Sequence, residues 1–270
     1  TNKILILSLY TPIFLLYPVA EIEVLARKEI FIFFIFIIYL FLNSFFLQNL
    51  YKLFFLPIAI LIWEPVIFYY LFFLAIDIIK NDIKKINNKI FINLSYYIPS
   101  VLIGLYIALN PISPEGHDVM AGYLKENFNE NCNIACIFLK SKSSLYSQFE
   151  GNFKLYSVEV FIRYFLIILI GFMPLFYLLK YSKFKNSELF YFKYFNNLLS
   201  PISIMYTPVV FLFAMGFDWG RWVNIFYVIL ALIYFQLLIK EHLVLDLEKL
   251  RKNFLYKIKG KVFVILFILF

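Results

Sequence analysis

Long apolar runs, separated by short polar connections, are the feature that most limits what this chain can fold into. Seven runs lie at about residues 4 to 20, 30 to 47, 53 to 79, 90 to 109, 157 to 179, 201 to 217 and 223 to 239, and an eighth begins at 262. A backbone in lipid must satisfy its own hydrogen bonds, and these runs are too long and too unalternating for barrel strands. The sequence therefore predicts an all-α, polytopic bundle of about seven to eight transmembrane helices.

The composition agrees with a membrane protein. The chain is 63% hydrophobic and 16% charged, and a single aqueous core cannot absorb that apolar excess. The net charge of +8 suggests nucleic-acid binding as one function. The basic residues, however, lie between apolar runs, where they indicate the orientation of the chain in the bilayer. We therefore expect membrane lipid as a partner and no nucleic acid.

The two ends of the sequence suggest a piece of a longer chain. It begins without Met and stops in VFVILFILF, whereas a span needs about 20 apolar residues. We expect residues 1–270 to form a single transmembrane domain that is a fragment, with residues 110 to 156 as its one long connection.

The basic residues predict the orientation of the bundle. When the connections are sorted alternately, one side holds 17 of the 25 Lys and Arg: Arg27, Lys28, Lys80, Lys84, Lys85, Lys89, Lys180, Lys183, Lys185, Lys193 and seven between Lys240 and Lys261. The positive-inside rule makes that side cytoplasmic and places 110 to 156 and 218 to 222 outside. This order requires 53 to 79 to be one kinked span, although Glu64-Pro65 at its centre also fits two half-helices.

The long connection carries one acidic and basic cluster. Glu115, His117 and Asp118 lie within four residues and supply a base beside an anionic partner. Asp118 also suits the cap of a short helix beginning VMAGYLKENF. A solvated turn with incidental polar residues explains the same cluster.

The only cysteines, Cys132 and Cys136, lie in the same connection. Their spacing of four is compatible with a disulfide on one helical turn, and an extracytoplasmic position permits oxidation. Free thiols are the alternative. A metal site has little support, because His117 is the nearest other soft ligand, and we expect no metal and no cofactor.

Three of the ionisable residues within the predicted spans are candidate site residues. Glu159 and Arg163 are four apart, in the order that favours a helical ion pair. Glu64 is near mid-bilayer, where an ionisable residue usually faces a polar cavity or a partner. By depth, Arg163 is the nearest candidate partner of Glu64.

The stretch DWGRW, residues 218 to 222, joins two apolar runs. Asp218 and Arg221 lie within one helical turn, Gly220 permits a close approach of the backbone, and Trp219 and Trp222 suit the headgroup level. A short outer hairpin with a surface ion pair is one interpretation. The other is that Arg221, flanked by aromatic rings, binds a phosphate or sugar group.

The layout of spans with DWGRW and PEGHD resembles bacterial envelope proteins of the O-antigen polymerase type and, more distantly, lipid-linked-sugar glycosyltransferases. The resemblance implies a protein of the bacterial inner membrane that acts on a polyprenyl-pyrophosphate-linked saccharide at the outer face. An inverting glycosyl transfer would use His117 or Asp118 as the base and Arg221 and Arg163 as the phosphate clamp, with Asp218 orienting Arg221.

Two other functions fit the same residues. In a transporter or flippase, Glu64, Arg163 and Asp218 would line a polar path, and broken helices would be expected. A non-catalytic membrane assembly subunit fits the sparse polar residues. Convergence of Glu64, His117, Arg163, Asp218 and Arg221 on one cavity would favour a site over a structural role.

Overall fold

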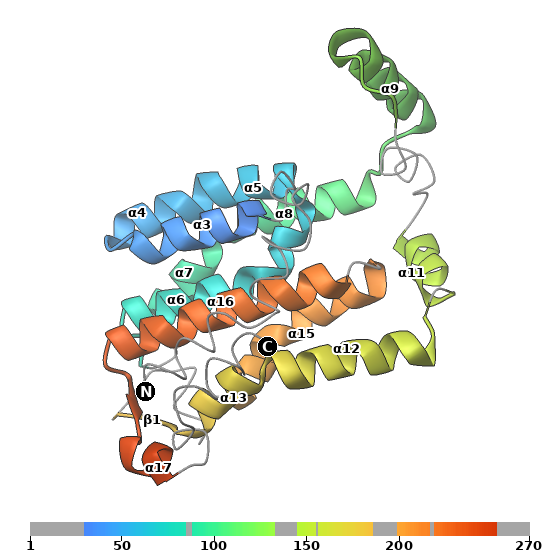
Figure 1. Ribbon diagram of the computed structural model, residues 1–270. Helices are drawn as coiled ribbons and strands as arrows, with labels where there is room; N and C mark the ends of the chain where they lie inside the picture. The colour runs from blue at the N-terminus through green and yellow to red at the C-terminus, as the bar shows by residue number, and fades with distance from the viewer. Residues whose placement is uncertain are drawn as a thin grey trace.

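The computed structural model describes residues 30–84, 88–132, 145–154, 156–185, 199–216 and 219–252, and this part of the chain is mostly helical (Figure 1). The helical segments are α3 (Ile30–Phe41), α4 (Phe45–Leu50), the π-helix η2 (Tyr51–Phe55), α5 (Leu56–Ile62), the 3-10 helix η3 (Glu64–Tyr69), α6 (Tyr70–Lys80), α7 (Asn88–Ser95), α8 (Ile98–Leu109), α9 (Pro114–Phe128), α11 (Leu145–Phe153), α12 (Val158–Gly171), α13 (Met173–Lys180), α15 (Leu199–Met215), α16 (Trp219–Ile239) and α17 (Leu247–Lys252). Two short strands, β1 (Ser182–Phe184) and β2 (Leu243–Leu245), pair antiparallel with Lys183 opposite Val244.

Prolines divide the predicted apolar runs into shorter helices. Pro65, Pro99 and Pro174 each lie in the first turn of the segment that follows a break. Proline lacks the N–H that would continue the preceding helix, whereas its fixed φ suits a first turn. The runs at 53 to 79, 90 to 109 and 157 to 179 are therefore each broken just before a proline.

Residues 45 to 80 form a helical hairpin. The chain leaves α5 through Trp63, whose backbone is extended, and then enters η3 and α6. The Lys52 side chain on the first arm contacts Asp77 on the second, so the two arms run back along each other. The prediction of one kinked span at 53 to 79 is wrong, and the predicted helix at 30 to 47 ends at Phe41.

One end of the bundle collects most of the described lysines, and we name it the basic end. It contains the α3–α4 turn, the end of α6, the β1–β2 hairpin and α17 (Figure 1). Lys80 Nζ donates to the Leu42 carbonyl at 2.6 Å, and Asp82 lies 3.4 Å from His242, so the ends of α3, α6 and α16 meet here. The lysines of this end are Lys80, Lys84, Lys89, Lys180, Lys183, Lys185, Lys240, Lys249 and Lys252.

The described lysines that the sorting placed together from Lys80 onward do lie at this end, whereas Lys85, Lys193 and the basic residues beyond Lys252 lie outside the described part of the chain. The hairpin adds one reversal that the prediction lacked, so the sorted order does not carry back to Arg27 and Lys28. Both of these residues lie outside the described part of the chain.

The opposite end is rich in aromatic rings, and we name it the aromatic end. Trp63 stacks on Trp222 with ring centroids 5.9 Å apart, and Trp219 packs against Tyr156 at 5.0 Å. The Trp219 indole donates to the Phe213 carbonyl at 2.8 Å, which holds the α15–α16 corner together. α9 begins beyond the end of α8 and projects away from the rest of the bundle (Figure 1).

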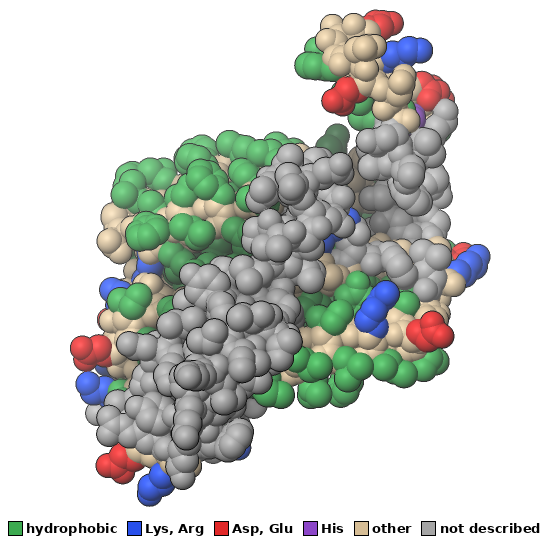
Figure 2. All heavy atoms as spheres, in the orientation of Figure 1, with side chains coloured by type: hydrophobic (Ala, Val, Ile, Leu, Met, Phe, Trp, Pro, Cys, Tyr) green, Lys and Arg blue, Asp and Glu red, His purple; other side chains and the backbone are tan. Residues whose placement is uncertain are grey.

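α16 lies inside the bundle and packs against α3, α6, α12 and α15. Its buried side chains include Ile225, Tyr227, Ile229 and Tyr234, which lie on several faces of the helix. A helix that is apolar all round is expected in a core or a membrane. Figure 2 shows hydrophobic side chains gathered over the α3–α5 layer and along α12, with charged side chains mainly near the helix ends.

Within the described residues, two helical stretches are long and apolar enough to cross a membrane, namely Phe45–Ile62 and Trp219–Ile239. The bent pairs α7–α8 (41°) and α12–α13 (49°) raise the number to four if each pair is one span. α3 and α15 are apolar but shorter. The predicted helical class is thus confirmed, and two to four helical stretches are apolar enough to span a membrane. The described residues do not reach the predicted seven to eight spans, and the predicted spans at 4 to 20 and from 262 lie outside them.

Candidate functional site

The residues that the sequence singled out within the spans do not form the predicted pairs. Glu64 is exposed at the start of η3, and no ion pair joins it to Arg163. Glu159 and Arg163 are both exposed on α12 and make no ion pair with each other. Instead, the Arg163 guanidinium lies 5.3 Å from the centroid of the Tyr164 ring.

DWGRW also differs from its prediction. α16 already begins at Trp219, so Gly220 and the half-buried Arg221 lie in its first turn rather than in a loop. Trp219 and Trp222 are buried in the bundle instead of standing at its surface. Asp218 lies outside the described residues.

The predicted cluster of the long connection lies on α9. The buried His117 ring places Nδ1 3.2 Å from Asp118 Oδ1, while Glu115 is exposed. Asp118 does not cap this helix: the helix begins at Pro114, and the Ser113 hydroxyl accepts from Gly116 N at 3.0 Å.

The cysteines of the long connection are described only in part. Cys132 is disulfide-bonded, and its Sγ lies 3.6 Å from His117 Nε2. Cys136, the only other cysteine of the chain, lies outside the described residues. In the described ranges no group of three His, Cys, Asp or Glu side chains is arranged to hold a metal ion.

A buried charge pair, which the sequence analysis did not identify, lies inside the 45–80 hairpin. Lys52 Nζ on η2 is 3.1 Å from Asp77 Oδ2 on α6, and both side chains are 0% exposed. Removing two charges from water costs several kcal/mol each, which only close pairing and further hydrogen bonds offset. Such a pair within apolar helices is therefore a strong candidate for a functional site.

Two tyrosines complete the shell of the carboxylate. The Tyr97 hydroxyl donates to Asp77 Oδ2 at 2.8 Å, and the Tyr39 hydroxyl donates to Asp77 Oδ1. With Lys52, three donors from three different parts of the fold converge on this one side chain. Asp77 thus ties α3, η2 and the α7–α8 junction to α6.

The ammonium group has its own set of partners. Lys52 Nζ donates to Asn93 Oδ1 on α7 and lies 5.4 Å from the centroid of the Tyr97 ring. A ring face attracts a cation in this position, and more strongly where water is excluded. Asn93 Nδ2 is buried and makes no hydrogen bond within the described residues, so the cluster keeps one donor for a further group.

Local sequence explains how Lys52 reaches the interior. Gln48, Lys52 and Leu56 recur every four residues and share a buried face of the first arm. A π turn over Tyr51–Phe55 precedes Pro57, which cannot donate the α-helical hydrogen bond at its own position. π turns inside helices are frequent at functional sites.

A layer of neutral and basic groups separates the buried pair from the basic end. Lys80 Nζ donates to the carbonyls of Tyr39 and Leu40 as well as Leu42. Asn81 Nδ2 donates to Gln48 Oε1 at 3.2 Å. Lys80 and Asn81 lie about one helical turn from Asp77 along the chain, on the side of the basic end.

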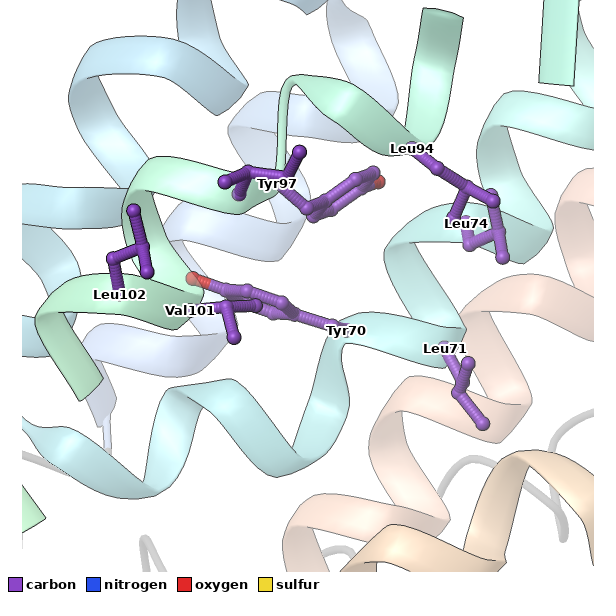
Figure 3. A pocket seen from close by; sticks show the side chains of 8 residues that line it. Tyr70, Leu71, Leu74, Leu94, Tyr97, Val101 and Leu102 are labelled. Carbon is purple, nitrogen blue, oxygen red and sulfur yellow. The ribbon is translucent and has the colours of Figure 1, made fainter. Parts of the chain in front are cut away.

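An apolar cavity of about 290 Å³ adjoins the cluster on the α7–α8 side (Figure 3). Its lining comes from α6 and α7–α8: Tyr70, Leu71, Leu74, Leu94, Tyr97, Ile98, Val101 and Leu102. The rings of Tyr70 and Tyr97 lie 5.3 Å apart, and their hydroxyls point in opposite directions (Figure 3). Tyr97 thus contacts both the cavity and, through its hydroxyl, Asp77.

Among the described residues, none of the predicted site residues lines this cavity. The signal that would have found the cluster is the presence of single opposite charges, Lys52 in YKLFF and Asp77 in LAIDIIK, within otherwise apolar runs. Comparison of the chain with models of known protein families, with curated proteins and with solved structures gives no match.

Proposed function

We propose that this chain is a proton-coupled transport protein of a bacterial inner membrane, with the Lys52–Asp77 pair as its proton-binding site. The observation that carries the proposal is the complete burial of a hydrogen-bonded charge pair inside a broken helical hairpin. Intramembrane ionisable residues with named partners mark proton and substrate paths, and broken helices are typical of transporters.

The chemistry follows from the charge of the cluster. Lys52 and Asp77 together are neutral, so they can remain buried. A proton added to Asp77 leaves the Lys52 ammonium without a counter-charge, and a single buried charge is far more costly than the pair. The cluster must then admit water or a substrate group, and this requirement couples protonation to a change in shape.

The same contacts explain which elements move. Asp77 holds Tyr97 and Lys52 holds Asn93, so the charge pair keeps the α7–α8 segment on α6. Loss of the pair loosens that seam, where α8 meets the hairpin. The basic end, as the cytoplasmic side of a bundle of about seven to eight spans, supplies the proton through the Lys80 layer.

Proton movement in vesicles tests the proposal. The full chain is reconstituted into vesicles with entrapped pyranine, and an imposed pH gradient is followed at a potential clamped by valinomycin and K⁺. The wild type is expected to dissipate the gradient faster than Lys52→Met/Asp77→Asn, which removes both charges together. Equal rates in the two proteins would overturn the proposal, and Lys154→Met/Glu150→Gln, an exposed pair, is the matched control.

A second candidate is glycosyl transfer on a polyprenyl-pyrophosphate-linked saccharide at the outer face. It is favoured by the His117–Asp118 contact, which is the base–carboxylate pair such a reaction needs. Arg221 and Arg163 would bind pyrophosphate and Asp218 would orient Arg221. Arg221→Lys keeps the charge but not the planar fork, so this function requires shortened envelope polysaccharide from a normally expressed variant. Polysaccharide of normal length would contradict it.

A further inference from the structure

The cavity between α6 and α7–α8 opens on an apolar surface. Leu94, Ile98 and Leu102 line it and are also exposed, at 40%, 53% and 60%. α7 and α8 together are long and apolar enough for one bent membrane span, so these side chains face hydrocarbon when the chain is inserted. The opening therefore faces the acyl chains of the bilayer.

The interior of the cavity suits a hydrocarbon chain. Six of its eight lining residues are Leu, Ile or Val, and the two tyrosines present ring faces and edges (Figure 3). The volume of 290 Å³ is near the lower limit of small-molecule sites. A single flexible chain fills such a space more readily than a rigid, drug-sized ligand.

The basic end supplies charge at the right distance for a headgroup. Lys89 precedes Leu94 by five residues on α7, a rise of about 7 Å along a helix. Lys84 follows α6 in the same connection, and both lysine side chains are exposed. Anionic lipid headgroups are attracted to lysines at the cytoplasmic face.

The geometry points to a binding site for an anionic phospholipid, with one acyl chain in the cavity and the phosphate near Lys84 and Lys89. This lipid site is a property beyond the proposed transport function, because lipid can bind here whether or not Asp77 takes up a proton. The chain would contact the Tyr97 ring and so brace the hydroxyl that donates to Asp77. The lipid is thus a structural partner that stabilises the position of the α7–α8 segment on α6.

Native mass spectrometry of the purified full chain tests the site. The probe is an equimolar mixture of phosphatidylglycerol and phosphatidylcholine with the same acyl chains. We expect one retained phosphatidylglycerol per chain. Val101→Trp places an indole in the cavity, and affinity should fall about tenfold if the burial of about two methylene groups is lost.

Leu105→Trp is the matched control, because Leu105 is exposed one turn further along α8 and does not line the cavity. It should retain lipid like the wild type. Lys84→Gln/Lys89→Gln should lose the preference for phosphatidylglycerol while still binding both lipids.

Equal lipid retention by Val101→Trp and Leu105→Trp would overturn the site. Displacement of the phospholipid by an equal concentration of polyprenyl phosphate would show a polyprenyl chain as the occupant and make the phospholipid assignment wrong. Neither result depends on proton movement in vesicles, so failure of the lipid site and failure of the proposed transport function are distinguished.

Discussion

Removing one charge of the buried pair should destabilise the protein far more than removing both. Asp77→Asn leaves the Lys52 ammonium 0% exposed and without a counter-charge, with Asn93 Oδ1 and the rings of Tyr96 and Tyr97 as its neighbours. Breaking a buried pair in this way costs about 3–5 kcal/mol, whereas replacing the whole pair by neutral groups of similar size is often neutral or stabilising. Lys52→Met should cost a similar amount, because Asp77 then keeps only its two tyrosine donors.

The double variant Lys52→Met/Asp77→Asn completes a double-mutant cycle, which measures the interaction between the two side chains. The side-chain amide that replaces the Asp77 carboxylate keeps one acceptor oxygen for one tyrosine hydroxyl and donates its N–H to the other, since a hydroxyl can also accept. The stability of this variant should therefore lie within about 1 kcal/mol of the wild type. The two single changes together cost at least about 6 kcal/mol and the double at most about 1 kcal/mol, which gives a coupling energy of about 5 kcal/mol or more. Unfolding equilibria in mixed detergent micelles measure each corner of the cycle.

An exposed pair provides the control for this cycle. Glu150 on α11 and Lys154, just past the end of that helix, lie 3.0 Å apart at 53% and 73% exposure. Their coupling should be about 0–1 kcal/mol, as for other surface pairs. A cost below about 1 kcal/mol for Asp77→Asn would refute the reasoning, because it would mean that the Lys52 charge is not confined in an apolar environment.

Three further predictions concern the contact between α6 and α7–α8, the β1–β2 hairpin, and the orientation of the chain in the membrane. Ser100 is buried, so a Cys at this position should resist maleimide at pH 8. After acidification, Ser100→Cys should react in the wild-type background but not in the Lys52→Met/Asp77→Asn background. Equal reaction at both pH values would contradict a contact between α6 and α7–α8 that is controlled by a proton. The Lys183 ammonium donates to Asp246, and this hydrogen bond lowers the pKa of that carboxyl and raises the pKa of Lys183. The pair therefore stabilises the β1–β2 hairpin fully between about pH 4 and about pH 10, and this stabilisation is lost as the pH falls through the lowered pKa of Asp246 or rises through the raised pKa of Lys183. Hydrogen-exchange protection, corrected for intrinsic rates, should be lower in Asp246→Asn than in the wild type at pH 7, and the difference should vanish once acid has protonated Asp246; an unchanged difference in acid would contradict the assignment. An impermeant maleimide should label Tyr146→Cys in intact cells but Lys183→Cys only after permeabilisation, and the reverse pattern would invert the orientation.

The helical class and the basic end could be predicted because they depend on the composition of short segments and not on how distant segments pack. About twenty apolar residues must be helical in lipid whatever their neighbours, and lysines at helix ends gather on one side. The breaks were predictable in principle, since Pro99 and Pro174 carry the same signal as Pro65. The prediction used only Pro65, and its single-span interpretation is wrong.

The candidate site was not predicted, because it depends on where the chain reverses. Lys52 and Asp77 are 25 residues apart, and they meet only because the hairpin turns at Trp63. Lys52 falls between the predicted runs at 30 to 47 and 53 to 79, and matching by depth paired Glu64 with Arg163. Depth along a span does not fix which face of a helix a side chain occupies, so such a pairing has no geometric basis.

The π turn at Tyr51–Phe55 lies in the first arm of the 45–80 hairpin, at the level of the Lys52–Asp77 pair, and is a point where the arm can change its helical geometry. A π turn contains one residue more than an α turn, and each residue of an α-helix accounts for about 100° of rotation. Conversion of this turn to α geometry would rotate one side of the first arm relative to the other and swing Lys52 away from Asp77. The arm could then reorient a single ammonium group by exchanging a few backbone hydrogen bonds, while α5 and α6 keep their packing.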